Sequence, residues 1–394
     1  MTKVAILGFG VVGGGVADLL TNNADCVARL GGEDIEIKYI LDLRDFPNSP
    51  FADKVVHDIS IILSDPEVDC IFEAMGGSHP AYEYTVAALR AGKSVITSNK
   101  EVVSKFGDEF LRVAAEHGVC YRFEAAVGGG IPVISPMISF IGQNRIREVR
   151  GILNGTTNYI LTKMFTFGDS FEESLKDAQE KGYAERNPDA DVLGIDACRK
   201  ITILTALSCG RLLDTDKIHT EGITAIRKED VLNAEKLGLS IKLLGRCIFT
   251  EEGMQVMVAP FMLGEETPLA TVKGVYNAVE VVGDPIGNVM FYGQGAGAGA
   301  TASAMVGDLM QIMRSGRSYA EPTWEKSCDG LSGFDSFVCR HYLAVGADAN
   351  ISVLGQVQTI GQGDEIALIT APMSEEKLNS IVGSLNVKSH IRLL

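Results

Sequence analysis

The sequence predicts an α/β protein: an N-terminal Rossmann-type doubly wound parallel sheet, an α+β substrate and dimerisation domain, and a short α+β tail. Over the first 125 or so residues, short apolar runs alternate with helical segments, the pattern of parallel strands joined by right-handed crossovers. From about residue 130 this alternation stops. The 394 residues allow two or three domains. We expect them at 1–130 (completed by about 295–320), 131–294 and 330–394.

The composition excludes several classes of protein. Hydrophobic residues make up 46% and charged residues 22%, which is ordinary for a globular chain. The formal net charge of −16 argues against a nucleic-acid partner, because phosphates would be repelled. The sequence shows neither a signal-peptide pattern nor an uncharged apolar stretch of ~18 residues. We therefore expect a cytoplasmic protein with no membrane partner and with a small molecule as its substrate.

Cysteine and histidine spacing gives no metal motif. The eight cysteines form no CxxC pair, and the six histidines form no HxxxH or HxH pair. Buried, reduced thiols and no transition-metal site are the expectation.

The expected elements follow from periodicity and turn residues. In the first domain we expect strands at Val4–Leu7, Ile35–Leu41, Val68–Phe72, Ser94–Thr97 and Val119–Phe123, with helices at Val11–Leu20, Tyr82–Ala91 and Gly107–His117. The second domain should contain helices at Asn158–Phe165, Ser170–Lys181 and Ile195–Ser208 and apolar runs at Gln255–Phe261 and Gly274–Val282. A Gly-Ala loop, Gly293–Gly299, should open a helix at Ala300–Arg314, with a linker at Ser315–Lys326.

The first expected strand runs directly into Gly8-Phe9-Gly10-Val11-Val12-Gly13. This is a GxGxxG pattern between a strand and a helix, the context in which a helix N-terminus meets a dinucleotide pyrophosphate. The acid that reads the ribose usually lies ~20 residues further on. The candidate here, Asp42, lies 29 residues past Gly13 and would favour NAD. Arg44 would instead contact a 2′-phosphate and so favour NADP. Alternatively, Arg44 only forms a surface ion pair with Asp42 or Asp45.

Two lysines are candidates for the chemistry. Lys100 follows the fourth strand, at the end where ligands of doubly wound sheets bind. We expect it to contact a reacting carbonyl or the nicotinamide ribose. The alternative is a solvated lysine at the start of a helix. Asp196 and Lys200 are four residues apart on an expected helix and share one face. They suit proton transfer, or they form an ordinary helix salt bridge.

Five separated segments resemble the homoserine dehydrogenase family, in the family's order over residues 1 to about 320. They are Ser98–Lys100, Glu124–Pro132, Gly151–Leu161, Gly182–Lys200 and Gly295–Gly299. The resemblance implies NAD(P)-dependent interconversion of L-homoserine and L-aspartate 4-semialdehyde, the branch step toward threonine and methionine. It also implies a homodimer or a higher homo-oligomer.

The resemblance assigns roles to residues. Glu185 would hold the substrate ammonium group, Asp196 would position Lys200, and Lys200 or Lys100 would give a proton to the aldehyde oxygen, with Lys200 favoured. The full set implied is Lys200, Lys100 and Asp196 for catalysis; Glu185, Asp191, Tyr183 and Thr156 for substrate; Gly8, Phe9, Gly10, Val11, Val12, Gly13, Arg44, Gly76, Ser98, Lys100 and Gly297 for NADP or NAD; and Glu124, Val127, Gly129 and Ile131, mainly through backbone oxygens, for a monovalent cation (Na⁺ or K⁺). The loop from Glu124 to Ile131 is alternatively only a tight turn.

Arg44-Asp45 resembles the family's arginine–aspartate pair and tilts the expectation toward NADP, whereas Asp42 departs from the apolar residue of many members. Two rival functions stay open: a dehydrogenase of another amino-acid-derived substrate, and a non-catalytic NAD(P)-sensing regulator. A regulator would need a basic DNA-reading element, and the sequence contains no basic run.

The tail resembles a shortened ACT regulatory domain. It has a strand-like run at Phe337–Val345, another at Glu365–Thr370 and a helix at Ser374–Leu385. Only Gly346 to Asp364 separates the two runs, so one helix of the module is lost or reduced. We expect a remnant that packs or assists assembly without strong threonine inhibition. The alternative is that two tails pair in a dimer and rebuild a ligand pocket.

Overall fold

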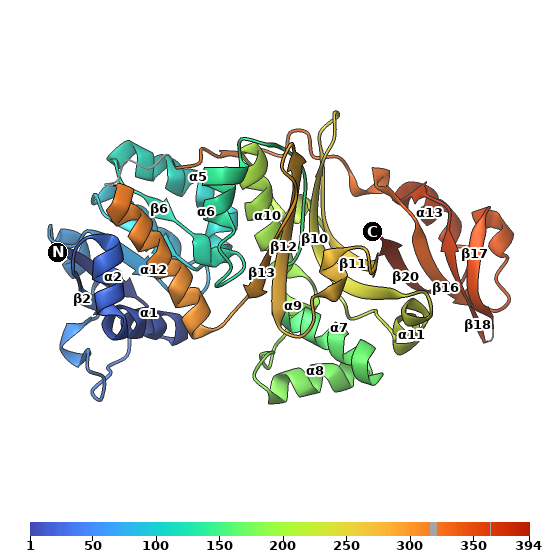
Figure 1. Cartoon of the computed structure of the whole chain (residues 1–394), viewed down its shortest axis with the longest axis horizontal. Coiled ribbons are helices and arrows are strands. Elements are labelled where there is room, and N and C mark those ends of the chain that lie inside the picture. Colours follow the sequence, from blue (N-terminus) through green and yellow to red (C-terminus); the bar gives the residue numbers. More distant parts are fainter. Residues whose placement is uncertain (316–320, 363) are drawn as a thin grey trace. The chain divides into compact units, whose positions relative to one another are not determined.

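A computed structural model describes residues 1–315, 321–362 and 364–394. The chain forms two compact units (Figure 1). Unit 1 contains Met1–Gln143, Thr202–Thr215 and Gly293–Ser327, and unit 2 contains Asn144–Ile201, Asp216–Tyr292 and Cys328–Leu394. The boundary falls inside helix α10 (Ile195–Cys209). The division into three domains stays a prediction.

Unit 1 is built on a six-stranded parallel sheet, as the sequence predicted. The strand order is β3 (Val55–Val56), β2 (Ile35–Leu41), β1 (Thr2–Leu7), β4 (Cys70–Glu73), β5 (Ser94–Thr97) and β6 (Tyr121–Arg122). All five neighbouring pairs are parallel. The central strand β1 is covered on both faces, which explains why its sequence is apolar throughout Val4–Leu7. The last predicted strand, Val119–Phe123, is shortened to β6.

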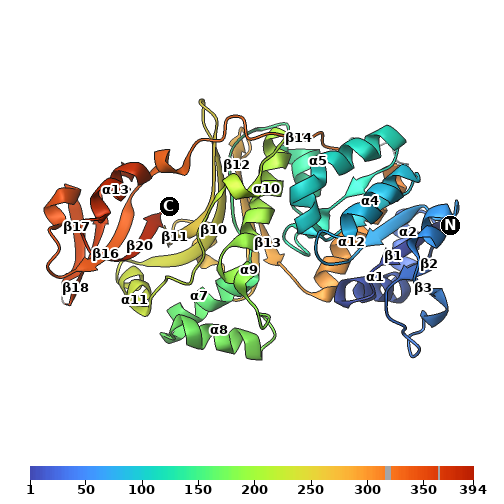
Figure 2. The same cartoon turned by 180° about the vertical axis from the view of Figure 1, so that it is seen from behind.

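Helices cover both faces of this sheet (Figures 1 and 2). On one face α1 (Val11–Asn22), α2 (Ala24–Gly31) and α12 (Ala298–Ser315) share one apolar core with the strands. On the other face lie α4 (Ala81–Arg90) and α5 (Lys100–His117). Two shorter helices, α3 (Ile59–Ser64) and α6 (Ile134–Pro136), complete the unit. The doubly wound arrangement is therefore confirmed.

Unit 2 is built on a ten-stranded mixed sheet. Its order is β13 (Gly287–Gln294), β12 (Tyr276–Asp284), β7 (Arg145–Ile152), β10 (Leu239–Phe249), β11 (Met254–Gly264), β20 (Val387–Leu393), β16 (His341–Gly346), β18 (Glu365–Thr370) and β17 (Val357–Gln362), with β9 (His219–Thr220) beside β11. The β10–β11 hairpin is antiparallel in full register, whereas β20 and β9 join β11 in parallel. The strands β7, β10 and β13 were not predicted.

The helices of unit 2 are α7 (Gly155–Phe167), α8 (Phe171–Glu180), α9 (Asp189–Val192), the first turns of α10, α11 (Lys228–Lys236) and α13 (Glu375–Val382). Three of them, α7, α8 and α13, begin at a residue whose side chain caps them. Asn154 caps α7 by accepting the backbone N–H of Thr157, and Ser170 forms a capping box with Glu173 at α8. None of the helices in the described part of the chain combines the length and apolar character needed to cross a bilayer.

The tail differs from the expected pattern in two ways. The predicted run Phe337–Val345 is interrupted at Arg340, where β15 (Val338–Cys339) ends and β16 follows after one residue. β15 pairs with β19 (Met373–Ser374) outside the main sheet. Between β16 and β17 the only helical segment is a single 3₁₀ turn at Ile351–Leu354, as expected for a reduced helix.

The predicted linker Ser315–Lys326 is a linker only in part. Residues 316–320 lie outside the described residues. In the remainder, β14 (Glu325–Lys326) pairs with β8 (Arg211–Leu212), and the buried Trp324 packs against α5 at Gly107. A Cβ atom at Gly107 would lie 2.6 Å from the indole ring, so this segment is fastened to unit 1.

A buried carboxyl group joins the ends of β4 and β5. Glu73 is fully buried; one oxygen accepts the backbone N–H of Met75 at 2.8 Å and the other accepts the hydroxyl of Thr97. That hydroxyl oxygen in turn accepts the backbone N–H of Asn99 at 2.9 Å. Burial raises the pKa of Glu73 to about 7. Glu73 thus fixes the two turns that follow these strands.

We predict that Glu73 makes stability depend on pH. Its pKa is about 7 in the folded chain and 4.5 without the fold, so between these values the folded state binds more protons. The free energy of unfolding therefore falls as pH rises through this window. The wild type should lose up to about 3 kcal/mol relative to Glu73→Gln, measured by urea unfolding across the window. Parallel pH curves for the two proteins would contradict the assignment.

Candidate active site

The glycine loop has the geometry of a dinucleotide-binding turn. Gly8 has a positive φ of 89°, which a side chain would disfavour. A Cβ atom at Gly13 would lie 1.9 Å from the Gly8 carbonyl oxygen, so the start of α1 packs on the end of β1 only because Gly13 has no side chain. A Cβ atom at Gly10, by contrast, would have no heavy atom within 4 Å. The loop therefore offers an open backbone surface at a helix N-terminus, which fits a pyrophosphate.

Asp42 fastens this loop to the end of β2. Its carboxylate accepts the backbone N–H of Phe9 at 2.8 Å and two guanidinium N–H groups of Arg44 at 3.0 Å each. The Arg44 hydrogen bond holds the pKa of Asp42 well below its usual range. Arg44 thus pairs with Asp42, one of the alternatives left open above, while its side chain remains 63% exposed.

The remaining cofactor candidates lie at the same edge of the sheet. In parallel strands all carboxyl ends meet at one edge, and the strand order of unit 1 reverses between β1 and β4. Gly76 follows β4, and Ser98 and Lys100 follow β5, where Lys100 is the first residue of α5. Gly297 lies before α12, with a positive φ of 117°, and its carbonyl accepts the backbone N–H of Thr301.

The second group of candidates forms a buried network in unit 2. The Lys200 ammonium group donates to the Asp196 carboxylate and to the backbone oxygen of Leu153, both at 2.7 Å. Lys200 is 7% exposed and Asp196 is 4% exposed. A buried ion pair is costly unless further hydrogen bonds complete it. Helix α10 can lie this close to β10 because Gly245 has no side chain. A Cβ atom at Gly245 would lie 3.0 Å from the Cβ of Ile201 on α10.

Asn154 completes this network and was not singled out from the sequence. Its side-chain amide donates to Asp191 at 2.7 Å and to Asp196 at 2.9 Å, while its amide oxygen caps α7. One residue therefore connects two acids and a helix start. The signal in the sequence was its place before Gly155, where an N-cap of a helix is expected.

Three further substrate candidates lie close to the start of α7. The Thr156 hydroxyl donates to the backbone oxygen of Tyr183 at 2.6 Å, and the ring of Tyr183 packs on that of Tyr159 with centroids 4.9 Å apart. Glu185 is exposed, and its backbone oxygen accepts the side-chain amide of Gln179 at 3.1 Å. Unit 2 thus holds Thr156, Tyr183 and Asp191 in one hydrogen-bonded region, with Glu185 on the adjoining loop.

The cation candidates lie in a tightly turned loop of unit 1. The buried Glu124 carboxylate accepts three backbone N–H groups, those of Val133, Ile134 and Ser135, each at 2.7 Å. This side chain therefore caps α6. Gly129 has a φ of 56° and packs on Gly295, and Val127 and Ile131 are buried. Backbone oxygens are the ligands that this loop can offer to a hard cation.

The glycine loop of unit 1 and the buried lysine–aspartate pair of unit 2 fit an NAD(P)-dependent oxidoreductase that acts on a CH–OH group, and the family matches assign the chain to that class. Residues 8–124 match the family model described as "Homoserine dehydrogenase, NAD binding domain", and residues 132–310 match "Homoserine dehydrogenase". The chain belongs to the homoserine dehydrogenase family.

Individual relatives agree with this assignment. A homoserine dehydrogenase of Pseudomonas aeruginosa is 39% identical over 95% of this chain and 89% of its own length. The crystal structure of a homoserine dehydrogenase from Thiobacillus denitrificans superimposes with a TM-score of 0.89 at 34% identity, covering 100% of this chain and 98% of that one. A hyperthermophilic archaeal homoserine dehydrogenase mutant, solved in complex with NADPH, has a TM-score of 0.69 at 25% identity over 80% of this chain and 98% of its own.

We predict that Asn154 supports activity and stability separately. Serine at this position keeps an N-cap oxygen for α7 but loses the amide donor to both acids, whereas alanine loses both functions. Asn154→Ser and Asn154→Ala should therefore lower kcat/KM similarly, and both should lose the stability that the amide donor gives to the two acids. Alanine should lose about 1 kcal/mol more unfolding free energy than serine, because it also lacks the cap. Steady-state kinetics and urea unfolding check this. Wild-type kcat/KM in Asn154→Ser would contradict the role of the amide.

Proposed function

We propose that the Lys200 network performs the proton transfer in the interconversion of L-homoserine and L-aspartate 4-semialdehyde. When bound, the nicotinamide supplies or accepts the hydride. In the reductive direction Lys200 gives a proton to the aldehyde oxygen; in the oxidative direction it takes that proton back. The observation that supports this most is the burial of Lys200 against Asp196 and Leu153.

The network suits this chemistry for an electrostatic reason. A cation held in a buried, preformed position stabilises the alkoxide that develops on the substrate oxygen. Asp196 and Leu153 hold the ammonium group in place, and Asn154 holds Asp196. We assign Glu185 to the substrate ammonium group, with Asp191, Tyr183 and Thr156 around it. Lys100, at the end of β5, would contact the same substrate oxygen or the cofactor.

NAD(P) is the cofactor class, and we propose a preference for NADP. Arg44 is exposed just beyond β2, where a 2′-phosphate of the adenine ribose would lie in a Rossmann fold. Asp42 is already neutralised by Arg44 and by the N–H of Phe9, so it is occupied as a structural anchor. This supports NADP over NAD.

We further propose a monovalent cation, Na⁺ or K⁺, at the loop containing Glu124, Val127, Gly129 and Ile131. Support comes from the conformation of the loop: two successive glycines with positive φ, Gly128 and Gly129, turn the backbone sharply. Because the Glu124 carboxylate is used to cap α6, the backbone oxygens would be the ligands.

A homodimer or higher homo-oligomer is supported by the edge of the unit 2 sheet. β13 is the edge strand, and apolar side chains are exposed on it at Met290 and Tyr292, on β12 at Tyr276 and in the turn between these strands at Ile286. The rings of Tyr276 and Tyr292 stack at 5.1 Å. Exposed apolar residues on an edge strand favour pairing with a second chain.

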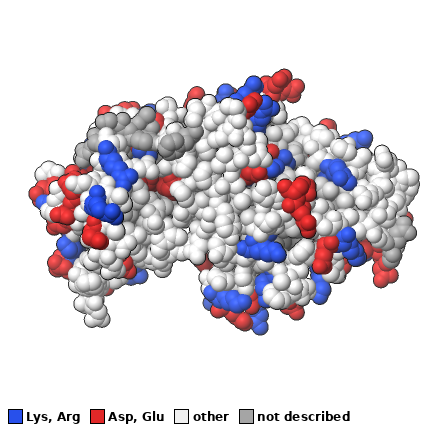
Figure 3. All heavy atoms as spheres, in the orientation of Figure 1, with Lys and Arg blue, Asp and Glu red and all other residues white. Residues whose placement is uncertain are grey.

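For the other partners we keep the expectation of a small-molecule substrate and of neither a nucleic-acid nor a membrane partner. On the face in Figure 3, acidic and basic side chains are interspersed among wide uncharged areas, which does not favour a nucleic-acid partner. The cytoplasmic location stays a prediction.

We predict that Lys200→Ala lowers turnover by about 10²–10⁴-fold, because a general acid is lost. Binding of NADPH, measured by fluorescence, should largely survive; Lys100→Ala should also lower turnover strongly. Lys176→Ala is the matched control, since Lys176 is an exposed lysine of α8. In Lys200→Ala the buried Asp196 carboxylate loses its lysine partner, which also lowers stability. The double variant Lys200→Ala/Asp196→Asn removes that negative charge, so a loss of turnover that persists in it reports on catalysis and not on stability. Near-normal turnover in Lys200→Ala would refute the assignment.

We predict that Arg44→Ala raises the KM for NADPH by about tenfold, because a charged partner of the phosphate is lost and Asp42 regains an uncompensated charge. The KM for NADH should change much less. Arg112→Ala, at an exposed arginine of α5, is the control. Equal changes in both Michaelis constants would show that Arg44 does not contact the phosphate.

We predict that the tail gives no strong threonine inhibition. Its first helix is reduced to the 3₁₀ turn Ile351–Leu354, and its strand β20 is hydrogen-bonded to β11. Homoserine oxidation by the whole chain should therefore be nearly the same with and without excess L-threonine, with D-threonine as the control. Clear, stereospecific inhibition would favour the alternative in which two tails rebuild a pocket.

A further inference from the structure

Three of the six histidines lie in the part of unit 2 around the tail, and one of them has an unusual environment. His341, at the start of β16, is fully buried. Its Nε2 atom lies 3.1 Å from the backbone oxygen of Met373. A carbonyl oxygen only accepts hydrogen bonds, so Nε2 carries the ring proton and Nδ1 presents its lone pair.

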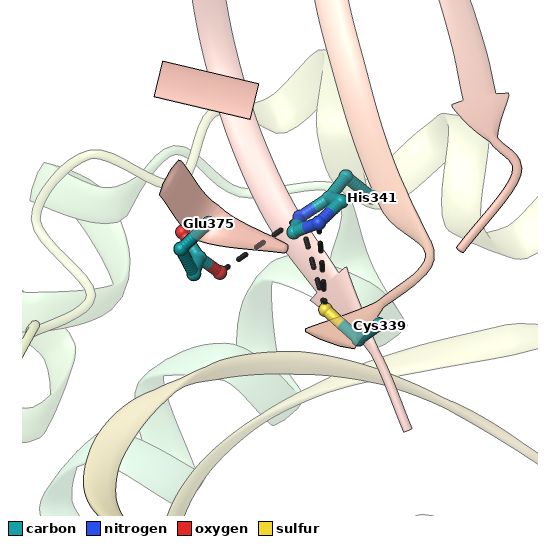
Figure 4. Close-up of side chains that lie close together, drawn as sticks. All are labelled: Cys339, His341 and Glu375. Carbon is teal, nitrogen blue, oxygen red and sulfur yellow. Dashed lines mark hydrogen bonds and ion pairs between the residues drawn. The ribbon is translucent and has the colours of Figure 1, made fainter. Parts of the chain in front are cut away.

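Three potential ligand atoms surround that lone pair (Figure 4 shows two of the three residues). From Nδ1 of His341, the sulfur of Cys339 lies at 3.7 Å, a carboxylate oxygen of Glu375 at 3.9 Å and Nε2 of His390 at 2.9 Å. The ligand atoms of Cys339, His341 and Glu375 all lie within 4.8 Å of one another. Around a tetrahedral ion with bonds of ~2.0–2.3 Å, neighbouring ligand atoms lie ~3.3–3.8 Å apart, so small movements suffice for Cys339, His341 and Glu375. His390 lies outside this close group and would have to move further.

One of the surrounding contacts is typical of a metal centre. Imidazole ligands of metals typically donate their second N–H to a backbone carbonyl, as His341 does to Met373. The Glu375 carboxylate is held by Arg392, whose Nε donates to one oxygen at 2.6 Å and whose Nη2 donates to the other at 3.2 Å, so a metal would share this carboxylate with the guanidinium group. Arg392 also pairs with Glu221 at 2.6 Å, so its charge is shared between two acids.

The two imidazole rings are neutral, the form that binds metals, because burial lowers the pKa of His341 and lowers that of His390 to about 3. Burial also raises the pKa of the Cys339 thiol to about 12, so the sulfur keeps its proton until a metal displaces it. Cys339 also lines a cavity of about 560 Å³ together with Arg246, Phe337 and Pro372. This cavity offers an ion a route to the sulfur.

We propose that Cys339, His341, His390 and Glu375 form a binding site for a divalent transition metal of the zinc class. Sulfur and nitrogen ligands select such ions over Mg²⁺ or Ca²⁺. On binding, the metal–sulfur bond replaces the S–H bond and one proton is released to solvent. The His390 proton moves from Nε2 to Nδ1, so that ring loses no proton. The site would fasten β15, β16, α13 and β20 to one another.

The proposed site departs from the expectation of no transition-metal site that was drawn from histidine spacing. The ligands come from three separate segments, 339–341, 375 and 390, which only the pairing of β16 with β20 and the approach of α13 bring together. Motif spacing cannot detect such a set.

The test uses Co²⁺ and the whole untagged chain, freed of metal by a chelator. We expect one Co²⁺ per chain, with a thiolate-to-cobalt charge-transfer band and the intense visible bands of tetrahedral cobalt. Cys339→Ser should remove the charge-transfer band, and His390→Gln should weaken binding by about tenfold or more. Cys26→Ser, at an exposed cysteine of α2, is the matched control and should leave the spectrum unchanged.

Two outcomes would overturn the proposal: no charge-transfer band at a small excess of Co²⁺, or a band that persists in Cys339→Ser. Thermal unfolding provides a second readout. Zn²⁺ should raise the unfolding midpoint of the wild type and not that of Cys339→Ser, while circular dichroism of both metal-free proteins confirms that the variant is folded. A rise of equal size in both proteins would also refute the site.

Discussion

The side-chain amide of Asn154 is the constraint on which the proposed substrate site of unit 2 depends. It lies where β7 ends and α7 begins, and it donates to Asp191 and Asp196 while its oxygen caps α7. Two carboxylates this close would repel one another without a shared donor. Because Asp196 is held in this way, the buried Lys200 has a fixed partner. The position of the proposed proton donor is thus set by the start of a helix.

The cofactor side follows a different constraint, the common edge at which parallel strands end. The backbone turns there sharply, and two of the turns are held by a carboxyl group at the end of a neighbouring strand. Asp42 after β2 fastens the glycine loop after β1, and Glu73 at the end of β4 fastens the turn after β5. Because the pKa of Glu73 is about 7, its carboxyl group gains or loses a proton close to neutral pH. The stability of this edge of the sheet is therefore coupled to proton binding. The rigidity needed to orient a dinucleotide is supplied by these short polar links.

The sequence was informative where the pattern is local. β1, the glycine loop and α1 are adjacent in the chain, and the requirement for glycine at positions 8 and 13 is a property of that single turn. The family segments around Lys200 were likewise contiguous. By contrast, β7 was missed because its apolar residues, Ile146, Val149 and Ile152, recur at every third position and do not alternate, and β13 because its side chains are largely exposed at an edge. The identity of β7 as a strand depends on β10 and β12, which lie far away in the chain.

The same limit applies to the sites. Asn154 joins residues 37 and 42 positions away, and the cluster around His341 includes His390, 49 positions further along the chain. Arg44 was singled out from the sequence as a cofactor residue, which stays a prediction, but its pairing with Asp42 required the geometry of the β2 turn. Residue types identify candidates for chemistry, whereas hydrogen bonds between distant segments decide which candidates act together.

The most direct test of the central claim is a structure of the enzyme with L-homoserine and the oxidised cofactor bound. The account predicts that the hydroxyl oxygen of the substrate contacts the ammonium group of Lys200, that Lys200 keeps its contact with Asp196, and that Glu185 contacts the substrate ammonium group. A complex in which the hydroxyl oxygen contacts Lys100 alone, with Lys200 remote from the substrate, would contradict the account.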